Sequence, residues 1–495
     1  MVSDINMENE PTVVKTDVGA KDGQNKCPKC GATDISHNAK TGKLRCNFCR
    51  HEFEHQKAVG LDTDIKELQG HIIGSGAQDI VADANDILTF KCSSCGAEVV
   101  IDTSEVTHAR CHWCRNTLSV NQQIPNGAVP DMLLPFSVNK GEAQTQIKEF
   151  VDKRKFFAHP TFTQEFTTDN IMGVYLPYMV VDINAHTKLA GQGEKQVKKY
   201  MRKQGDKNVT YYDADVYDVE RDFDIAVSGL TVESSADKLG KGSSNTTNNV
   251  INSIMPFDIE NSVKWDANYL KGYTSEKRDT NVEELQGLVN TQAQDIARHK
   301  ANDDLKEYDR GVAWKKEELD IKGQQWKAAY LPVWLYSYQQ LKNGGESLLH
   351  YVAVNARTKE TMGSVPIHLS KLLGVSAIIE ILGIILWMLS PMLFDDISLW
   401  PLALSGFAFF FIMHLRYRNT HARHEHESET KSTMSNLQRY DKFVVRRTKL
   451  KNAKMNGANN TRVGDKNIGG DLLKSVAGST SVGGFISQQI DDKLK

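Results

Sequence analysis

The chain has 495 residues, of which 40% are hydrophobic, and its 60 Lys and Arg residues nearly balance its 62 Asp and Glu residues. This length allows more than one domain, and the near-neutral charge excludes a uniformly basic nucleic-acid-binding protein. The apolar residues are concentrated in one block, residues 372–415, so the average composition hides a segment of a different kind.

Residues 1–25 are mostly polar and predict a disordered N-terminus. Residues 1–20 contain no apolar stretch of the roughly 7–15 residues that a secretory signal needs. We therefore expect the N-terminus to stay in the cytosol.

All eight cysteines lie in the first quarter of the chain, in four Cys-x-x-Cys pairs that form two units offset by 65 residues. In each unit, fifteen residues separate the two pairs. The cysteines are Cys27, Cys30, Cys46 and Cys49 in the first unit and Cys92, Cys95, Cys111 and Cys114 in the second. Cytosolic thiols stay reduced, so this pattern indicates metal ligands rather than disulfides.

Each unit is predicted to hold one structural zinc ion, which prefers four tetrahedral thiolates at about 2.3 Å. Gly31 and Gly96 follow the first pairs, where a residue without Cβ can take positive φ. Two separate sites are favoured over a cross-braced pair, because each pair closes a shorter loop with its near partner. Iron in a rubredoxin-like site is the chemical alternative, and neither site keeps an open position for catalysis.

The two units differ in their charge. Residues 26–53 carry six Lys and Arg against two Asp and Glu, whereas residues 91–120 carry three against three. Phe48 and Trp113 hold equivalent positions and either stack on bases or cover the metal site. Nucleic-acid binding is therefore an alternative that one of the two units supports.

Residues 132–370 predict an α+β domain. Helices are expected after Asn139 and Asn281, because each is followed three residues later by a glutamate, Glu142 or Glu284, and then by apolar residues at helical spacing. Strand-like runs cover residues 174–182, 211–227, 329–336 and 348–354. The first and third of these runs share the sequence Tyr-Leu-Pro.

No catalytic motif occurs in this domain: the sequence has no phosphate loop, no His-Glu-x-x-His and no Gly-x-Ser-x-Gly. We therefore predict no catalytic residues and a protein that is not an enzyme. A membrane-bound enzyme housed in residues 132–370 is a third option without a motif behind it.

Two apolar runs, residues 372–394 and 399–415, predict a pair of transmembrane helices, the second at the short end of the roughly 17–25 residues that a span needs. The turn between them is acidic, whereas Lys371 precedes the pair and arginines follow it. By the positive-inside rule both flanks are cytosolic. The alternative is a buried helical hairpin in a soluble protein.

Glu380 lies well inside the first span and is a candidate functional residue, because a carboxylate in hydrocarbon is costly. Two spans cannot enclose a transport path, so we prefer a glutamate that is protonated or paired with a neighbouring helix. Such a glutamate could lie at a contact between copies of the chain.

The residues after the second span are predicted to be cytosolic. Residues 439–454 carry seven Lys and Arg against one acid, and they either lie against anionic lipid headgroups or form a solvated basic face. The Gly-, Asn- and Ser-rich residues that follow predict a flexible tail.

The units CPKCGA…CNFCR and CSSCGA…CHWCR, the LLPF and YLPVW segments and the VNART turn before SVPIHLSK resemble a family of Gram-positive bacterial membrane proteins, the transcription-factor-IIB-type zinc-ribbon-containing proteins. The resemblance extends nearly to the end of the second span and implies that the eight cysteines are the metal ligands. It also implies a setting of envelope stress, with phage-shock-like or SPFH-domain proteins as partners. Some members resemble primosomal helicase in their ribbons, but this sequence lacks the motor motifs.

We expect a multidomain protein with two small β zinc ribbons, a central α+β domain and a C-terminal transmembrane hairpin with a flexible tail. The expected segments are residues 1–25 (disordered), 26–55 (ribbon), 56–90 (linker), 91–120 (ribbon), 132–370 (α+β), 372–394 and 399–415 (membrane helices) and 416–495 (basic, flexible tail). Such a protein would either recruit protein partners to the inner face of the cell membrane or tether nucleic acid there.

Overall fold

The computed structural model describes residues 2–3, 11–14, 27–32, 35–38, 41, 43–53, 58, 64–79, 88–91, 98–101, 123–125, 130–205, 207–235, 246–247, 254–255, 257–270, 273–276, 278–341, 347–393, 400–418, 423–424 and 431–451. Strands dominate these residues, and fifteen of them join one large sheet. A separate three-stranded sheet carries the first cysteine unit.

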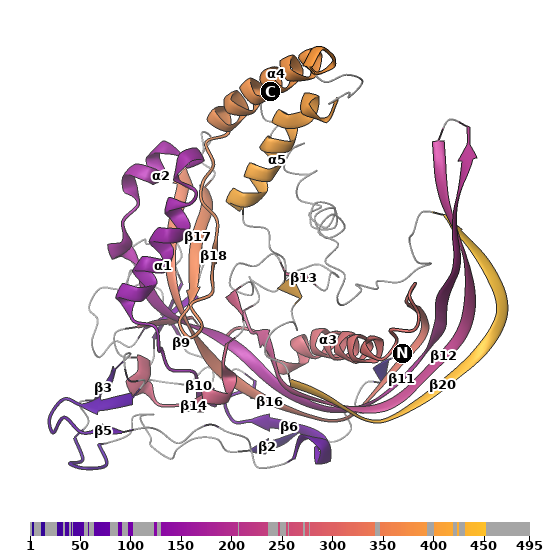
Figure 1. The fold of residues 1–495 in the computed structure, drawn as a ribbon. Coiled ribbons are helices and arrows are strands. Elements are labelled where there is room, and N and C mark those ends of the chain that lie inside the picture. The colour runs from indigo at the N-terminus through magenta and orange to yellow at the C-terminus, as the bar shows by residue number, and fades with distance from the viewer. Residues whose placement is uncertain are drawn as a thin grey trace.

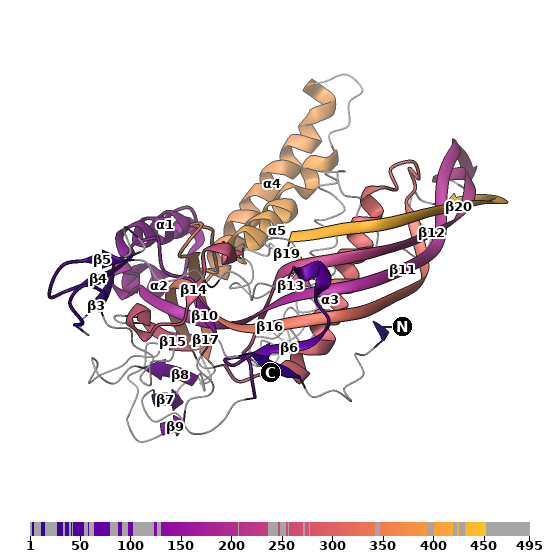
Figure 2. The same cartoon turned by 90° about the horizontal axis from the view of Figure 1, so that it is seen from below.

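Four long strands form the body of the large sheet: β16 (Val312–Leu341), β11 (Met172–Gln204), β12 (Lys207–Glu233) and β20 (Lys431–Lys451). Each is antiparallel to its neighbour in that order. Figures 1 and 2 show them side by side in a strongly curved layer. In the β11–β16 ladder, Leu176 lies opposite Leu331, so the two Tyr-Leu-Pro runs face each other.

Shorter strands extend this sheet along both sides. They are β1 (Val2–Ser3), β2 (Thr12–Val14), β6 (Gly70–Gly74), β7 (Leu88–Lys91), β8 (Glu98–Ile101), β9 (Gln123–Pro125), β10 (Met132–Leu133), β14 (Val263–Lys264), β15 (Thr274–Glu276), β17 (Ser347–Asn355) and β18 (Thr361–Gly363). A two-stranded pair, β13 (Thr246–Thr247) and β19 (Arg423–His424), lies apart from it. All four strand-like runs expected from the sequence are confirmed as parts of β11, β12, β16 and β17.

Helix α3 (Val282–Asp303) lies in the concave face of the large sheet (Figure 1). Its apolar stripe, including Leu285, Val289 and Ile296, packs with Trp326 and other buried residues of the strands. Burial of this stripe stabilises the helix more than its intrinsic propensity does. The expected capping box is present, since Glu284 accepts a hydrogen bond from the backbone N–H of Asn281.

Helices α1 (Lys140–Asp152) and α2 (Pro160–Glu165) cover a second core. At α1, Asn139 and Glu142 exchange both hydrogen bonds of the expected capping box, at 3.0 and 3.1 Å. Short 3₁₀ helices connect the other elements. They are η1 (Ile65–Glu67), η2 (Lys155–Phe157), η3 (Thr168–Asn170), η5 (Ile259–Asn261), η6 (Ala267–Leu270) and η7 (Trp400–Leu404).

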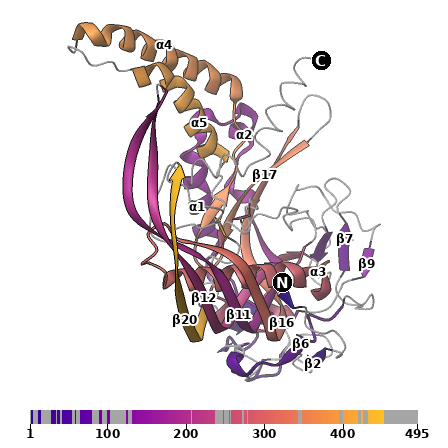
Figure 3. The same cartoon turned by 90° about the vertical axis from the view of Figure 1, so that its right-hand side faces the viewer.

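The apolar block forms α4 (Leu369–Leu393), η7 and α5 (Ser405–Arg418), which pack against one another and project from the sheet (Figure 3). Glycines allow the close approach: a Cβ at Gly383 would lie 2.1 Å from the carbonyl oxygen of Leu402. Within the described residues, one segment, Leu369–Ser390, is long and apolar enough to cross a membrane. The expected second helix over 399–415 is instead split between η7 and α5.

Several expected boundaries need correction. Residues 431–451, expected within a flexible tail, form β20, and residues 70–74 of the expected linker form β6. Within the expected disordered N-terminus, residues 2–3 and 12–14 pair as β1 and β2 with β16 and β6. Edge strands take their conformation from a partner's backbone hydrogen bonds, so their own sequence carries a weak signal.

The basic composition of β20 concealed its strand character. Its register places Lys442 opposite Asp218, and Asp441 of β20 forms an ion pair with the buried Arg221 of β12 at 3.1 Å. Opposite charges on neighbouring strands favour pairing. The central domain is therefore discontinuous in sequence: the helices α4 and α5 are inserted between two strands of one sheet.

Candidate metal centre

The first cysteine unit is built on three short antiparallel strands, β3 (Ile35–Asn38), β4 (Lys43–Cys46) and β5 (Glu52–Phe53). The first Cys-x-x-Cys pair precedes β3, and the second begins at the last residue of β4. In the β3–β4 register Ile35 lies opposite Cys46. The ladder therefore brings the second pair back to the first, as the fifteen-residue spacing predicts.

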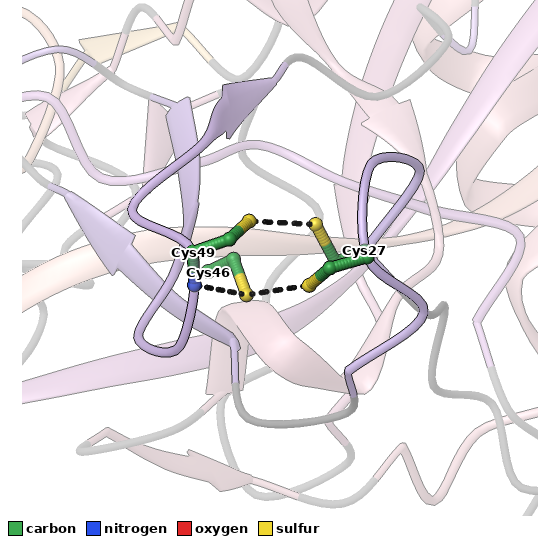
Figure 4. A group of neighbouring side chains, drawn as sticks. Cys27, Cys46 and Cys49 are labelled. Atoms are coloured by element: carbon green, nitrogen blue, oxygen red, sulfur yellow. Dashed lines mark hydrogen bonds between the residues drawn. The ribbon is translucent and has the colours of Figure 1, made fainter.

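The four sulfurs of this unit lie together (Figure 4), and all are within 4.8 Å of one another. The Sγ atoms of Cys27 and Cys49 are 3.6 Å apart, as are those of Cys30 and Cys46. Four thiolates at 2.3 Å from a common centre would be roughly 3.8 Å apart, so these distances suit a tetrahedral ion. The unit can therefore hold one metal ion.

Backbone hydrogen bonds shape each turn around the sulfurs. In the first turn the Gly31 N–H donates to the Cys27 carbonyl at 2.8 Å, and in the second the Arg50 N–H donates to the Cys46 carbonyl at 2.9 Å. The residue after each pair takes positive φ, 72° at Gly31 and 58° at Arg50. Glycine adopts this conformation freely, whereas arginine is strained there and is held by the turn.

The thiols titrate differently. Burial opposes ionisation of Cys27, but donation to its sulfur from backbone N–H groups of Cys30 and Lys29 brings the pKa of this thiol to about 7. At Cys30 the backbone N–H of Ala32 lowers the pKa, yet burial and the neighbouring thiols raise it to about 12. The Cys27 thiolate therefore forms readily while Cys30 keeps its proton until a cation compensates the charge, which favours metal binding over a free thiolate cluster.

The unit is attached to the central domain and is not a free module. Ile35 and Leu44 are fully buried in the same apolar cluster as Tyr269 and Leu270 of η6. The sequence predicted a separate ribbon over residues 26–55. Its three strands are too short for their sequence to show which surface of the protein they will cover.

Phe48, at the tip of the second turn, is 81% exposed. Of the two roles expected for it, stacking on bases or covering the metal site, the second does not fit this exposure. Arg45 and Arg50 are exposed nearby.

The second unit falls on residues that the structure does not describe: Cys92, Cys95, Cys111 and Cys114 all lie outside the described ranges. The strands on either side of its first pair are described. β7 and β8 pair antiparallel with Lys91 opposite Glu98, and β8 continues onto β15 of the large sheet.

Glu380 lies on α4 where α5 begins. Its Oε2 accepts the backbone N–H groups of Gly406 at 2.7 Å and Phe407 at 3.1 Å. These two N–H groups belong to the first turn of α5 and have no partner within their own helix. The glutamate thus caps the neighbouring helix, with its acceptor oxygen at the positive end of the helix dipole.

The sequence did not single out a polar cluster on the large sheet. The two ring nitrogens of His186 lie 2.8 Å from Asp224 and 3.0 Å from Asp222. Hydrogen bonds from Lys322 and His186 lower the pKa of Asp224 to about 2. The cluster joins β11, β12 and β16, and only strand pairing brings these residues together.

Comparison with known proteins gives one informative similarity. The chain is 22% identical over 346 residues to an uncharacterized protein, YdjG, of Bacillus subtilis (strain 168). The alignment covers 70% of this chain and 91% of that protein. No family model and no solved structure matches the chain.

Proposed function

We propose that this chain is a membrane-anchored scaffold that holds two structural zinc ions in the cytosol and recruits protein partners to the inner face of the cell membrane. The observation that carries the proposal is the path of the chain around the apolar helices. It leaves the sheet after β18, forms α4, η7 and α5, and returns as β20 beside β12.

This path constrains the membrane topology. The ends of the inserted segment belong to one domain, so both lie on the same side of any bilayer that α4 crosses. A single crossing would leave β20 on the opposite side from β12. Residues 400–418, helical in two consecutive segments, are long enough to make the return crossing at about 17–25 residues per span.

The cysteines indicate on which side of the membrane the domain lies. A cluster of reduced thiols persists in the cytosol and is oxidised outside the cell. The flanking cations Lys371 and Arg416 also favour the cytosol for the ends of the two helices. We therefore place both termini in the cytoplasm, with one zinc ion on each cysteine unit and no catalytic role for either.

The cysteine and strand motifs support membership of the transcription-factor-IIB-type zinc-ribbon-containing membrane proteins. On that basis we propose partners of the phage-shock-like or SPFH-domain kind and a role in envelope stress. Contacts between the helices and the domain, such as the hydrogen bond that the Phe157 N–H of η2 donates to the Tyr417 hydroxyl at 2.6 Å, would hold such partners at a fixed height above the bilayer.

Reporter fusions test the topology. A fluorescent protein, which matures only in the cytosol, should be bright at the C-terminus, and alkaline phosphatase should be active only when inserted in the acidic turn at residues 395–398. Phosphatase activity at the C-terminus would refute the hairpin. Affinity capture from solubilised membranes, compared with a chain carrying Cys46→Ser and Cys111→Ser, then tests recruitment: specific partners lost with the zinc sites support the scaffold.

The second candidate function is a membrane-tethered nucleic-acid-binding protein, which the exposed Phe48 and its neighbouring arginines favour. The full chain in nanodiscs should then bind single-stranded nucleic acid with a steep salt dependence, and Phe48→Ala should weaken binding by about 1–3 kcal/mol. If the chain binds no nucleic acid at physiological salt, this second function is refuted and the scaffold function stands.

A further inference from the structure

The strands β11 and β12 continue as a long hairpin past the end of β16, with β20 beside β12 as far as Tyr211. The last residue pair that β16 makes with β11 is Val312 with Gly193, whereas β11 and β12 stay paired to Gln204 and Lys207. We name residues 194–216 the arm. At about 3.3 Å per residue its strands extend roughly 35 Å beyond β16.

Tyr212, Ala214 and Val216 are buried at the base of the arm, and aromatic and cationic side chains stiffen the part beyond them. Tyr200 stacks on Tyr211 with ring centroids 5.9 Å apart, and Arg202 lies over the Tyr200 ring at 5.4 Å. On the other face Lys199 lies over Tyr212 at 5.6 Å. Such contacts keep a long ribbon extended while its outer atoms stay in solvent.

The outer part of the arm is strongly basic. Residues 195–211 contain six Lys and Arg and one acid. Asp213 and Asp215 lie opposite Lys198 and Lys195 of β11, and the Asp213 carboxylate accepts a hydrogen bond from the Tyr200 hydroxyl at 3.2 Å. They offset the cations at the base of the arm, so the excess of positive charge lies toward the turn, at Lys199, Arg202, Lys203 and Lys207.

Large apolar side chains are exposed among these cations: Met201 is 72% exposed and Val197 is 51% exposed. Val197 sits where the β11–β12 register shifts, at a bulge that turns side chains outward. Apolar groups surrounded by lysines match the chemistry of a lipid interface, where alkyl groups enter the boundary layer and ammonium groups meet phosphates.

The arm rises on the same side of the curved sheet as α4 and α5, as Figures 1 and 3 show. The other end of the same sheet is fixed to those helices. Near it, Lys371 donates to the Phe156 carbonyl at 2.7 Å and also lies over the Phe156 ring. The sheet thus connects the base of the helices to the arm.

We propose, on the basis of the membrane anchorage proposed above, that the arm is a second membrane contact. Its tip binds the anionic headgroup layer of the bilayer that holds α4 and α5. The lysines contact lipid phosphates and Met201 enters the interface, so the sheet bridges two points on one membrane. Nucleic acid would satisfy the cations but would leave Met201 and Val197 without an apolar environment.

Photocrosslinking of the full chain in nanodiscs tests this proposal. With p-benzoylphenylalanine in place of Met201, irradiation should yield lipid adducts in phosphatidylglycerol discs and few in phosphatidylcholine discs. The paired changes Lys199→Gln and Lys203→Gln should lower the yield about tenfold or more. The matched pair Lys66→Gln and Lys315→Gln, which removes two exposed lysines outside the arm, should leave it unchanged.

Two further crosslinker positions distinguish the membrane contact of the arm from the membrane anchorage of α4 and α5. In place of Ile378, on the exposed face of α4, the crosslinker should label lipid in discs of either composition; in place of Phe48 it should not. Lipid adducts at 378 without any at 201 would overturn the arm proposal and leave the anchorage intact. Failure at both positions would overturn the anchorage, and crosslinks from 201 to copurified nucleic acid would assign the arm a different ligand.

Discussion

The small cysteine sheet and the large curved sheet are both antiparallel, yet different interactions stabilise them. The small sheet has strands of four, four and two residues and buries few side chains of its own. The large sheet buries continuous apolar faces against α3 and around residues such as Trp326. A metal ion held by the four cysteines would therefore contribute a large part of the folding free energy of the first, beside the contacts of Ile35 and Leu44 with the central domain, whereas hydrophobic burial supplies that of the second.

Removing one cysteine thiolate should have the largest effect, and it should destabilise the small sheet while leaving the large sheet folded. Cys46→Ser is expected to lower the zinc content from about two ions per chain to about one, with the loss of up to about 10 kcal/mol of local stabilisation. Amides of residues 35–53 should then exchange rapidly with solvent while those of β11 and β16 stay protected. Elemental analysis and hydrogen exchange measure the two effects.

Ser36→Ala, on an exposed position of the same small sheet, is the control and should keep both ions. Loss of all zinc in Cys46→Ser would show that the two units share ligands, contrary to the separate sites proposed here.

Truncation of the core should affect the large sheet instead. Trp326 is fully buried, so Trp326→Ala is expected to lower the free energy of unfolding by about 3–5 kcal/mol. Thermal unfolding of the protein in nanodiscs measures the change, and zinc content should stay constant. Trp400→Ala, at an exposed tryptophan, should lower the free energy of unfolding far less than Trp326→Ala does. Equal losses of free energy in the two variants would mean that burial does not determine the stability of the large sheet.

The hairpin is stabilised by a third means, a polar cap between helices. Glu380→Leu leaves the N–H groups of Gly406 and Phe407 without an acceptor and should cost about 1–2 kcal/mol. Glu380→Gln keeps an acceptor oxygen and should cost less. Unfolding in a denaturing detergent series measures the difference.

Oligomer size in mild detergent distinguishes this cap from an intermolecular role. Because Glu380 is satisfied within one chain, assembly should be the same for both variants. A smaller oligomer for Glu380→Leu would assign the carboxylate to a contact between copies.

The smallest effect is expected at the His186 cluster. The pKa of Asp224 is lowered from 3.8 to about 2 in the folded protein, so its stabilisation is complete above about pH 4 and is lost as the pH falls toward 2. Asp224→Asn should therefore cost about 1 kcal/mol at neutral pH, after allowance for partial exposure, and progressively less in acid. Denaturant unfolding at pH 6 and pH 3 measures the trend, which a constant difference would contradict.

Local sequence signals anticipated the elements that local chemistry determines. The capping glutamates Glu142 and Glu284 marked where α1 and α3 begin, because a cap acts within four residues. The spacing of the cysteine pairs anticipated the thiol cluster of the first unit, because the loop between them is short. Alternating patterns located the central parts of β11, β12, β16 and β17, whose faces are half-buried or buried.

The sequence by itself determined where the first cysteine cluster, the apolar helix long enough to cross a membrane and the strand-forming segments occur along this chain. Only the tertiary structure decided that β20 closes the sheet after the helices, that β6 and the first residues join it, and that Glu380 caps α5. These outcomes depend on hydrogen bonds and charge pairs between residues up to 317 positions apart, as in the Val2–Leu319 pair. No local pattern encodes such a pairing, because each partner's preference becomes defined only when the other strand is already in place.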